Sequence, residues 1–175
     1  MAVSNSKFVG IKGCAVYRCE NDVPITSAPQ VDNVTITVPE ITFNTVDVNI
    51  MGTVSIPDMT SLDNIQLSVN IPVDNPDAAE LMQVGLQNWR ISYVVSNVNN
   101  QGVETITPCS IYATGFVTGI PNAEISKGGD GTADVTMNLM RFKKYTGERV
   151  DIDIDRSTGT LIIKGVNYNT ISSLY

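Results

Sequence analysis

Hydrophobic and polar residues alternate along most of this chain with a period of two. The alternation is clearest at residues 65–71, where every odd position is apolar, and at residues 34–38, where every residue is β-branched. It returns at residues 150–155, where one valine and two isoleucines alternate with three aspartates. This period is typical of a strand that has one buried and one solvated face. The chain is therefore predicted to consist mainly of β-strands.

Short segments rich in proline, glycine, asparagine and aspartate separate these strands. Residues 97–102 predict a hairpin turn, and residues 127–131 predict a glycine-rich loop. Pro108 is expected to divide residues 103–118 into two strands. About nine strands joined by such turns, without alternating helices, predict an antiparallel β-barrel or β-sandwich.

The length of 175 residues suits a single domain, residues 1–175. We expect residues 1–10 to form an N-terminal arm, with the first strand following from Gly10. Residues 39–62 are expected to form an extended loop or hairpin region. Within it, Met51 and Gly52 interrupt the alternation, which indicates a bulge or a point of close backbone contact.

One short helix is predicted between residues 74 and 86. Asn75 suits the N-cap and Pro76 the first helical position, while nearby acidic residues favour the positive end of the helix dipole. Four apolar residues are expected to face inward. They are Leu81, Met82, Val84 and Leu86.

The composition excludes several classes of protein. A formal net charge of -7 argues against a surface that grips nucleic acid phosphates. No apolar run approaches the roughly 20 residues of a membrane helix, and we expect no secretion signal at the N-terminus. Cys14, Cys19 and Cys109 are expected to be reduced thiols, because their number is odd and no secretion signal is expected. A Cys14–Cys19 disulfide would form only in an oxidising medium, and the spacing does not fit a zinc site.

The chemistry of a catalytic or metal site is missing from the sequence. The chain contains no histidine, which removes the commonest general base and the Ser-His and Cys-His pairs. Asp151, Asp153 and Asp155 have the alternate spacing that begins an EF-hand loop, but the glycine that this loop requires is absent. We therefore expect no enzyme activity and no cofactor, and interpret the three aspartates as the solvated face of a strand or the lining of a wet cavity.

Three cations flank the turn that precedes this acidic strand. They are Lys143, Lys144 and Arg149. Either they form a solvated, charged loop, or they pair with acidic groups of a neighbouring subunit.

The order of these elements resembles the major tail tube proteins of contractile phage tails. The resemblance begins with the β-branched strand at residues 34–38, continues with a polar strand that ends in Met51-Gly52, and includes the amphipathic strand at residues 65–71. In the C-terminal half it includes the Lys-Gly-rich loop at 127–131 and the acidic strand at 150–155. It extends over about residues 10–169, with loose individual motifs.

The resemblance implies a tail-tube-like β-barrel or sandwich with one short helix and an extended arm. It also implies hexameric rings that stack into a tube within a contractile sheath, in a phage tail, a phage-tail-like bacteriocin or a type VI secretion system. The expected partners are further copies of the chain, the tail sheath protein, and baseplate and tape-measure proteins. DNA would pass through the lumen without specific binding. The expected location is the virion tail or tail-like particle, after synthesis in the bacterial cytoplasm.

Under this interpretation, polar strand faces are candidates for the lumen or for contacts between subunits. The lumen candidates are residues 44–56 and 65–71, while the acidic face at 151–155 either lines the lumen or meets the sheath. The candidate lumen or intersubunit residues are Asp47, Asn49, Met51, Gly52, Gln66, Ser68, Asn70, Asp151, Asp153, Asp155, Lys143, Lys144 and Arg149. The alternative function is an extracellular β-sandwich binding module, which would require a signal peptide and clustered exposed aromatic residues.

Overall fold

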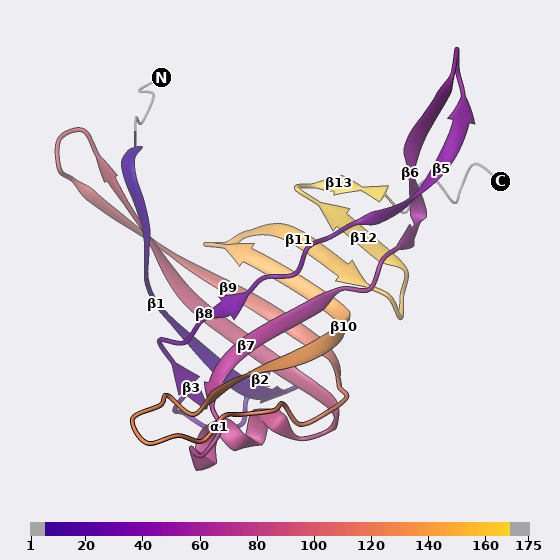
Figure 1. Cartoon of the computed structure of the whole chain (residues 1–175). Helices are drawn as coiled ribbons and strands as arrows, with labels where there is room; N and C mark the ends of the chain where they lie inside the picture. The colour runs from indigo at the N-terminus through magenta and orange to yellow at the C-terminus, as the bar shows by residue number, and fades with distance from the viewer. Residues whose placement is uncertain (1–5, 169–175) are drawn as a thin grey trace.

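The fold consists of one large antiparallel sheet and one projecting hairpin (Figure 1). The structure of the protein is a computed structural model that describes residues 6–168, except for the side chains of residues 6–8, 59 and 60. Within that range it has thirteen strands. They are β1 (Ser6–Glu20), β2 (Val23–Pro24), β3 (Val31–Asp32), β4 (Ile36–Thr37), β5 (Phe43–Asn49), β6 (Thr53–Leu62), β7 (Gln66–Pro72), β8 (Gly85–Asn99), β9 (Glu104–Val117), β10 (Thr132–Thr146), β11 (Arg149–Asp155), β12 (Thr160–Ile163) and β13 (Val166–Asn167).

The large sheet contains eleven strands and curls onto itself. Its main order is β13-β12-β11-β10-β9-β8-β1-β2, and β7 joins it by pairing with β10. The short strands β3 and β4 follow each other along the chain, yet β3 pairs with β1 and β4 pairs with β7. Residues 31–37 therefore bridge from β1 to β7, and the curled sheet forms a barrel-like body, which we call the barrel. The prediction of an antiparallel, mainly β fold is confirmed.

Strand β10 belongs to both layers of this barrel. One of its edges binds β7 over residues 132–138 and then β11 over residues 141–146, while its other edge binds β9. The change of partner coincides with a register shift, since Leu139 lies opposite Gly115 and Arg141 opposite Thr114. The extra residue, Met140, bends the strand, as a β-bulge does. The bend carries β10 from one layer into the other.

Apolar side chains from both layers fill the barrel. Ile91 lies opposite Ile111 and Trp89 opposite Ala113 on β8 and β9, and all four are buried. The indole Nε1 of Trp89 donates to Gln87 Oε1 at 2.6 Å, so the largest core side chain also has its polar atom satisfied. Burial of each large aliphatic side chain contributes roughly 1.5–3 kcal/mol, so this core accounts for most of the favourable folding energy.

The helix is shorter than the sequence predicts. Helix α1 (Pro76–Ala79) continues as a 3-10 turn, η1 (Glu80–Met82). Asn75 caps α1 as expected, because its Oδ1 accepts from the backbone nitrogen of Asp77 at 2.9 Å. Among residues 6–168 no helix is long and apolar enough to span a bilayer.

The predicted inward side of this helix is only half right. Leu81 is buried and Met82 packs against the core, but Val84 is 63% exposed and Leu86 61% exposed. The reason is that the chain has already left the helix: β8 begins at Gly85 and alternates, so Leu86 points outward while Gln87 and Trp89 point inward.

Two predicted strand boundaries are wrong. The first strand begins at Ser6 rather than Gly10, because residues 6–11 pair with the far end of β8. Pro108 does not interrupt β9, where it lies opposite Val94. The carbonyl of Pro108 accepts a hydrogen bond from the nitrogen of Gly147 at 2.8 Å. The nitrogen of Pro108 therefore also points toward the turn that follows β10. Because the pairing of β9 with β10 ends at Cys109, no N–H is needed at position 108 for that pairing.

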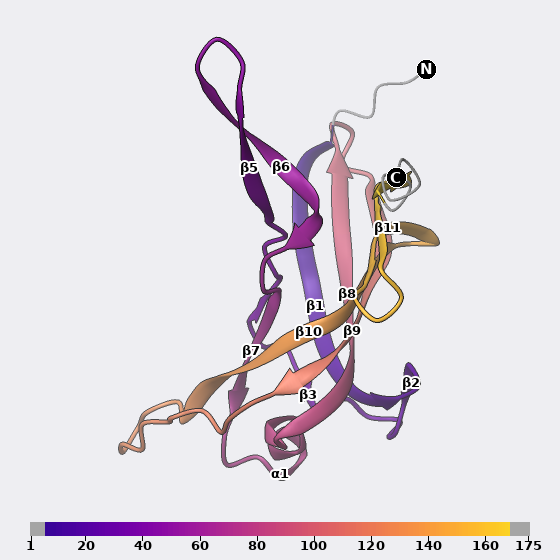
Figure 2. The same cartoon turned by 90° about the vertical axis from the view of Figure 1, so that its right-hand side faces the viewer.

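Strands β5 and β6 form a two-stranded hairpin that projects from the barrel (Figure 2). It occupies most of the segment 39–62 for which the sequence predicts an extended region. Phe43 and Leu62 at its base pack against the barrel core. Beyond this base, the hairpin extends past the body of the protein (Figure 2).

Candidate functional site

The outer face of β7 and the first half of β10 carries a ladder of paired polar side chains. Directly opposite residues are joined by side-chain hydrogen bonds across the two strands, which lie side by side in Figure 1. The bonds are Gln66 Nε2 to Asn138 Oδ1 at 3.0 Å, Ser68 Oγ with Thr136 Oγ1 at 3.0 Å, and Asn70 Nδ2 to Asp134 Oδ1 at 2.9 Å. We call these six residues the polar ladder.

The alternation of both strands produces the polar ladder. Leu67, Val69 and Ile71 on β7 are fully buried, so the residues between them must face outward. On β10, Val135 and Met137 are buried in the same way. The polar ladder thus presents amides and hydroxyls with a single carboxylate, that of Asp134, and it contains no cation.

The β5–β6 hairpin is amphipathic and projects without cover on either face. Its polar face holds Asp47, whose carboxylate accepts from the hydroxyl of Ser55 on the opposite strand, and Asn49. Its apolar face remains exposed, from 43% to 61% for each side chain. The residues of that face are Val46, Ile50, Val54 and Ile56.

The tip of the hairpin is a tight turn. Met51 has a positive φ of 50° and its side chain is fully exposed, while Gly52 has a φ of 124°. A glycine adopts that second conformation readily, and residues with a Cβ rarely do. Exposed apolar surface on a hairpin of two strands is unfavourable in an isolated chain, and is typical of a protein contact.

The three aspartates of β11 all have partners within the chain. Asp151 accepts from the hydroxyl of Thr146 and from Arg149 Nε at 2.9 Å, and Asp155 accepts from Ser157 Oγ at 2.5 Å. These hydrogen bonds lower the pKa of both carboxyls from the ordinary value of 3.8. The row therefore consists of carboxylates with separate partners and offers no shared metal site.

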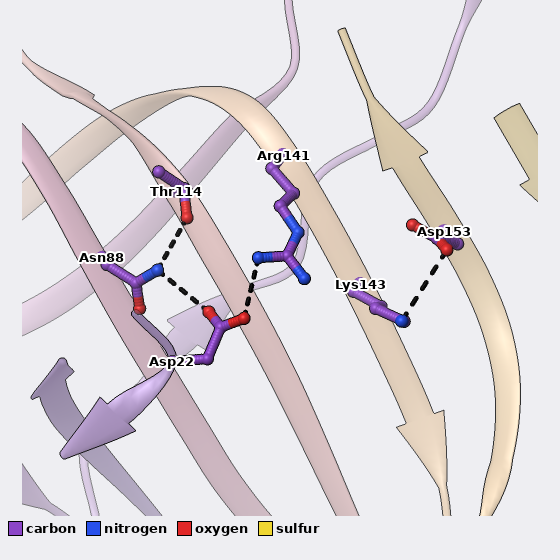
Figure 3. A network of polar contacts seen from close by, with 6 residues as sticks. All are labelled: Asp22, Asn88, Thr114, Arg141, Lys143 and Asp153. Atoms are coloured by element: carbon purple, nitrogen blue, oxygen red, sulfur yellow. Dashed lines mark hydrogen bonds and ion pairs between the residues drawn. The ribbon is translucent and has the colours of Figure 1, made fainter. Parts of the chain in front are cut away.

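The cations near this row separate to opposite faces of the sheet. Lys143 lies directly opposite Asp153, with Nζ and Oδ2 3.8 Å apart (Figure 3). A hydrogen bond with Tyr145, and then the charge of Asp153, raise the pKa of Lys143. Lys144 lies opposite Ile111, on the other face of β10, and lines an apolar hollow of about 330 Å³. Its charge nevertheless helps to lower the pKa of Asp151, so Lys144 lies near the Arg149–Asp151 pair, while Lys143 pairs with Asp153.

Comparison with known protein families identifies the family of this chain. Residues 26–171 match the family described as phage tail tube protein FII. The chain belongs to the phage tail tube family. The resemblance on which the sequence interpretation rests is thereby confirmed, and the protein is a structural subunit of a phage tail tube. No individual curated protein matches the chain.

The tail tube subunit also contains a polar network that the sequence does not indicate. Asp22 Oδ2 accepts from Arg141 Nη1 at 2.7 Å, and its Oδ1 accepts from Asn88 Nδ2 at 2.9 Å (Figure 3). Asn88 also donates to Thr114 Oγ1 at 2.8 Å. One carboxylate thus links the β1–β2 turn to β8, β9 and β10.

The position of Asp22 depends on its turn. Asn21 and Asp22 both have positive φ, at 52° and 64°, in a two-residue loop between Glu20 and Val23. Such a loop is a type I′ hairpin turn, which favours asparagine and aspartate. The Asn-Asp pair was therefore a usable signal for the turn, but not for the partners of its side chains.

A series of aromatic and cationic side chains crosses the same face of the tube subunit. The guanidinium Cζ of Arg90 lies 5.8 Å from the ring centre of Tyr112, whose ring meets that of Tyr145 edge-on at 5.7 Å. Lys143 Nζ lies 5.3 Å from the ring centre of Tyr145. The first two contacts join neighbouring strands and the third lies within β10, so the series stabilises the sheet and gives this face a partly cationic surface.

Proposed function

We propose that the chain forms the inner tube of a contractile injection system, either a phage tail or a phage-tail-like bacteriocin. Copies assemble into hexameric rings, and the rings stack around a channel that conducts DNA or breaches a target membrane. The role is structural and involves no catalysis. The observation that carries the proposal is the polar ladder, a flat, hydrogen-bonded face without a cation on a subunit of a tube.

The chemistry of the polar ladder suits the wall of a DNA channel. Proteins hold DNA mainly through lysine and arginine contacts to phosphates, and each such contact would slow a moving duplex. The polar ladder has no such cation, and Asp134 contributes a charge of the same sign as the phosphates. Its amides and hydroxyls already bond each other at 2.9–3.0 Å, which reduces their capacity to bind passing bases.

The β5–β6 hairpin suits the contact between stacked rings. Its exposed apolar face would be buried against a second copy, with a gain of about 25 cal/mol for each Å² removed from water. The hairpin projects beyond the barrel of its own subunit, so it is positioned to contact another copy (Figure 2). The remaining outer surfaces would meet the sheath, the tape-measure protein and the baseplate in the virion tail or tail-like particle.

Electron microscopy of the purified protein tests this proposal. The expected result is tubes or stacked rings with sixfold symmetry and an axial channel lined by β7 and β10. A double variant in the hairpin, Ile50→Ser with Met51→Ser, should leave the fold intact and give single rings or monomers. A protein that stays monomeric at high concentration in every salt condition would contradict the proposal.

A further inference from the structure

A hollow of about 470 Å³ lies on the outer face of the sheet, beside the β1–β2 turn. The side chain of Arg90 lines it, together with the hydroxyl-bearing side chains of Tyr17, Ser27 and Ser92. Tyr17 and Arg90 lie directly opposite each other on β1 and β8, so they share this face. All four side chains offer hydrogen-bond donors, and a guanidinium is suited to a carboxylate or a phosphate.

Among residues 6–168, Arg90 forms no ion pair with a carboxylate. Arg141 and Arg149 each form an ion pair, with Asp22 and Asp151 respectively. The Nε of Arg90 is buried without a hydrogen-bond partner, and burial of an unsatisfied polar group costs about 1–3 kcal/mol.

The ring of Tyr112 holds this guanidinium in place at 5.8 Å from the ring centre. The contact orders a long side chain in advance, which reduces the entropy lost when a ligand binds. Arginine and tyrosine held in this way are typical of residues that contribute most to protein contacts.

The hollow also adjoins a free edge of the large sheet. Strand β2 ends the sheet order and pairs only with β1 among the described strands. Val23 and Ile25 at this edge are 65% and 56% exposed. Open edges and exposed apolar groups are where another chain is expected to bind.

We propose that the Arg90 hollow receives an aspartate or glutamate side chain from a second copy of this chain. The proposal rests on the proposed function, because a tube places copies side by side. The chain carries 18 acidic and 11 basic residues, so each copy offers neighbours an excess of carboxylates. A DNA phosphate fits this position less well, because the hollow adjoins a free sheet edge with exposed Val23 and Ile25, which suit contact with a protein chain rather than with a polyanion.

Assembly of four variants, followed by sedimentation and electron microscopy, tests this inference. Arg90→Gln should raise the protein concentration needed for tube formation at least tenfold, and Arg90→Lys should have a smaller effect, because lysine cannot form a bidentate contact. Ser27→Asp places a carboxylate beside the hollow within the same chain, and should impair assembly as Arg90→Gln does. Lys127→Gln removes one charge from an exposed loop elsewhere and should assemble normally.

A photo-crosslinking residue at position 27 identifies the occupant of the hollow. In assembled tubes it should join the hollow to an acidic peptide of another copy. The inference is overturned if Arg90→Gln and Ser27→Asp both assemble normally into tubes and their thermal unfolding is unchanged. A crosslink that joins the hollow only to a different protein also overturns the inference. The same is true if the unmodified subunit binds DNA and Arg90→Gln abolishes this binding. Absence of tubes from the unmodified protein contradicts the proposed function instead.

Discussion

The backbone of Asn138 passes directly over Gly115. A Cβ at position 115 would lie 2.1 Å from the carbonyl oxygen of Asn138 and 2.9 Å from the Cα of Leu139. A Cβ atom does not approach backbone atoms this closely, so glycine is required for steric reasons at this position. The contact occurs where β10 changes partner from β7 to β11, and it allows the two layers of the barrel to share one strand.

Gly115→Ala should therefore destabilise the subunit. The methyl group must displace backbone rather than a flexible side chain, which typically costs about 1–3 kcal/mol, and here we expect the upper end. Urea unfolding of the two proteins measures the difference in the free energy of unfolding. Gly119→Ala is the control, because a Cβ there meets nothing within 4 Å. Equal stability of both variants would show that β10 can move away from β9.

Asp22→Ala should loosen the contact between the β1–β2 turn and the sheet. The change removes the partner of Arg141 and one partner of Asn88. Because Asp22 and Arg141 are 28% and 34% exposed, solvent screens their attraction, and we expect a loss of about 1–2 kcal/mol in the free energy of unfolding. Lys12→Ala breaks a more exposed pair with Glu104 and should change stability less than Asp22→Ala does. A larger effect from Lys12→Ala would contradict this ranking.

The network of Asp22 illustrates what the sequence could not predict. Asp22 and Arg141 are 119 positions apart, and no local pattern connects them. Half of the residues in the polar ladder likewise could not be predicted from a local pattern. Gln66, Ser68 and Asn70 are evident from alternation, whereas their partners depend on the register of β7 against a strand more than 60 positions away.

Local signals, in contrast, predicted most of the strands and the helix cap. Alternation at residues 65–71 and 150–155 identified β7 and β11; β7 has one fully buried face, whereas only Ile154 is buried on β11. The error at Pro108 has a physical cause: its nitrogen points toward the turn beyond the last paired residues of β9 and β10, and a single sequence does not show where that pairing ends. The exposed Leu86 was misassigned because the helix ended one turn earlier than its apolar pattern.

The pKa of Asp151 should depend on Thr146. The hydroxyl of Thr146 is the main cause that lowers this pKa below 3.8, and the nearby charge of Arg149 adds to it. A carboxyl with a lowered folded-state pKa stabilises the fold above its unfolded-state pKa, and that contribution disappears as pH falls through the folded-state value. Thr146→Val should therefore raise the pKa of Asp151, and make stability less dependent on pH below about 4.

Carboxyl chemical shifts followed by NMR across a pH titration measure this effect. Asp155 serves as the internal control, because its pKa is lowered chiefly by Ser157 and should not change in Thr146→Val. The reciprocal variant, Ser157→Ala, should raise the pKa of Asp155 alone. If both carboxyls shift in both variants, they interact directly rather than through separate partners.

Lysine substitutions should identify the face that lines the channel. Ser68→Lys places a cation in the middle of the polar ladder, and the tube repeats it in every subunit. Each added cation can contact a phosphate, so DNA delivery should fall by about tenfold or more, with a stronger effect at low salt. Tube length in electron micrographs should remain normal, since Ser68 lies on the outer face of β7 rather than in the core.

Two further variants distinguish the polar ladder from the other acidic surfaces. Asp47→Lys alters the polar face of the hairpin, and Asp151→Lys alters the β11 row, where Asp151 already pairs with Arg149. If the polar ladder lines the channel, both should deliver DNA normally wherever they assemble, and Asp47→Lys should affect ring stacking first. Reduced delivery by Asp151→Lys in tubes of normal length, with Ser68→Lys unaffected, would instead assign the channel to β11. Normal delivery by all three variants would contradict an electrostatic role for the channel wall, because a ring of new cations would then pass DNA as freely as the original surface.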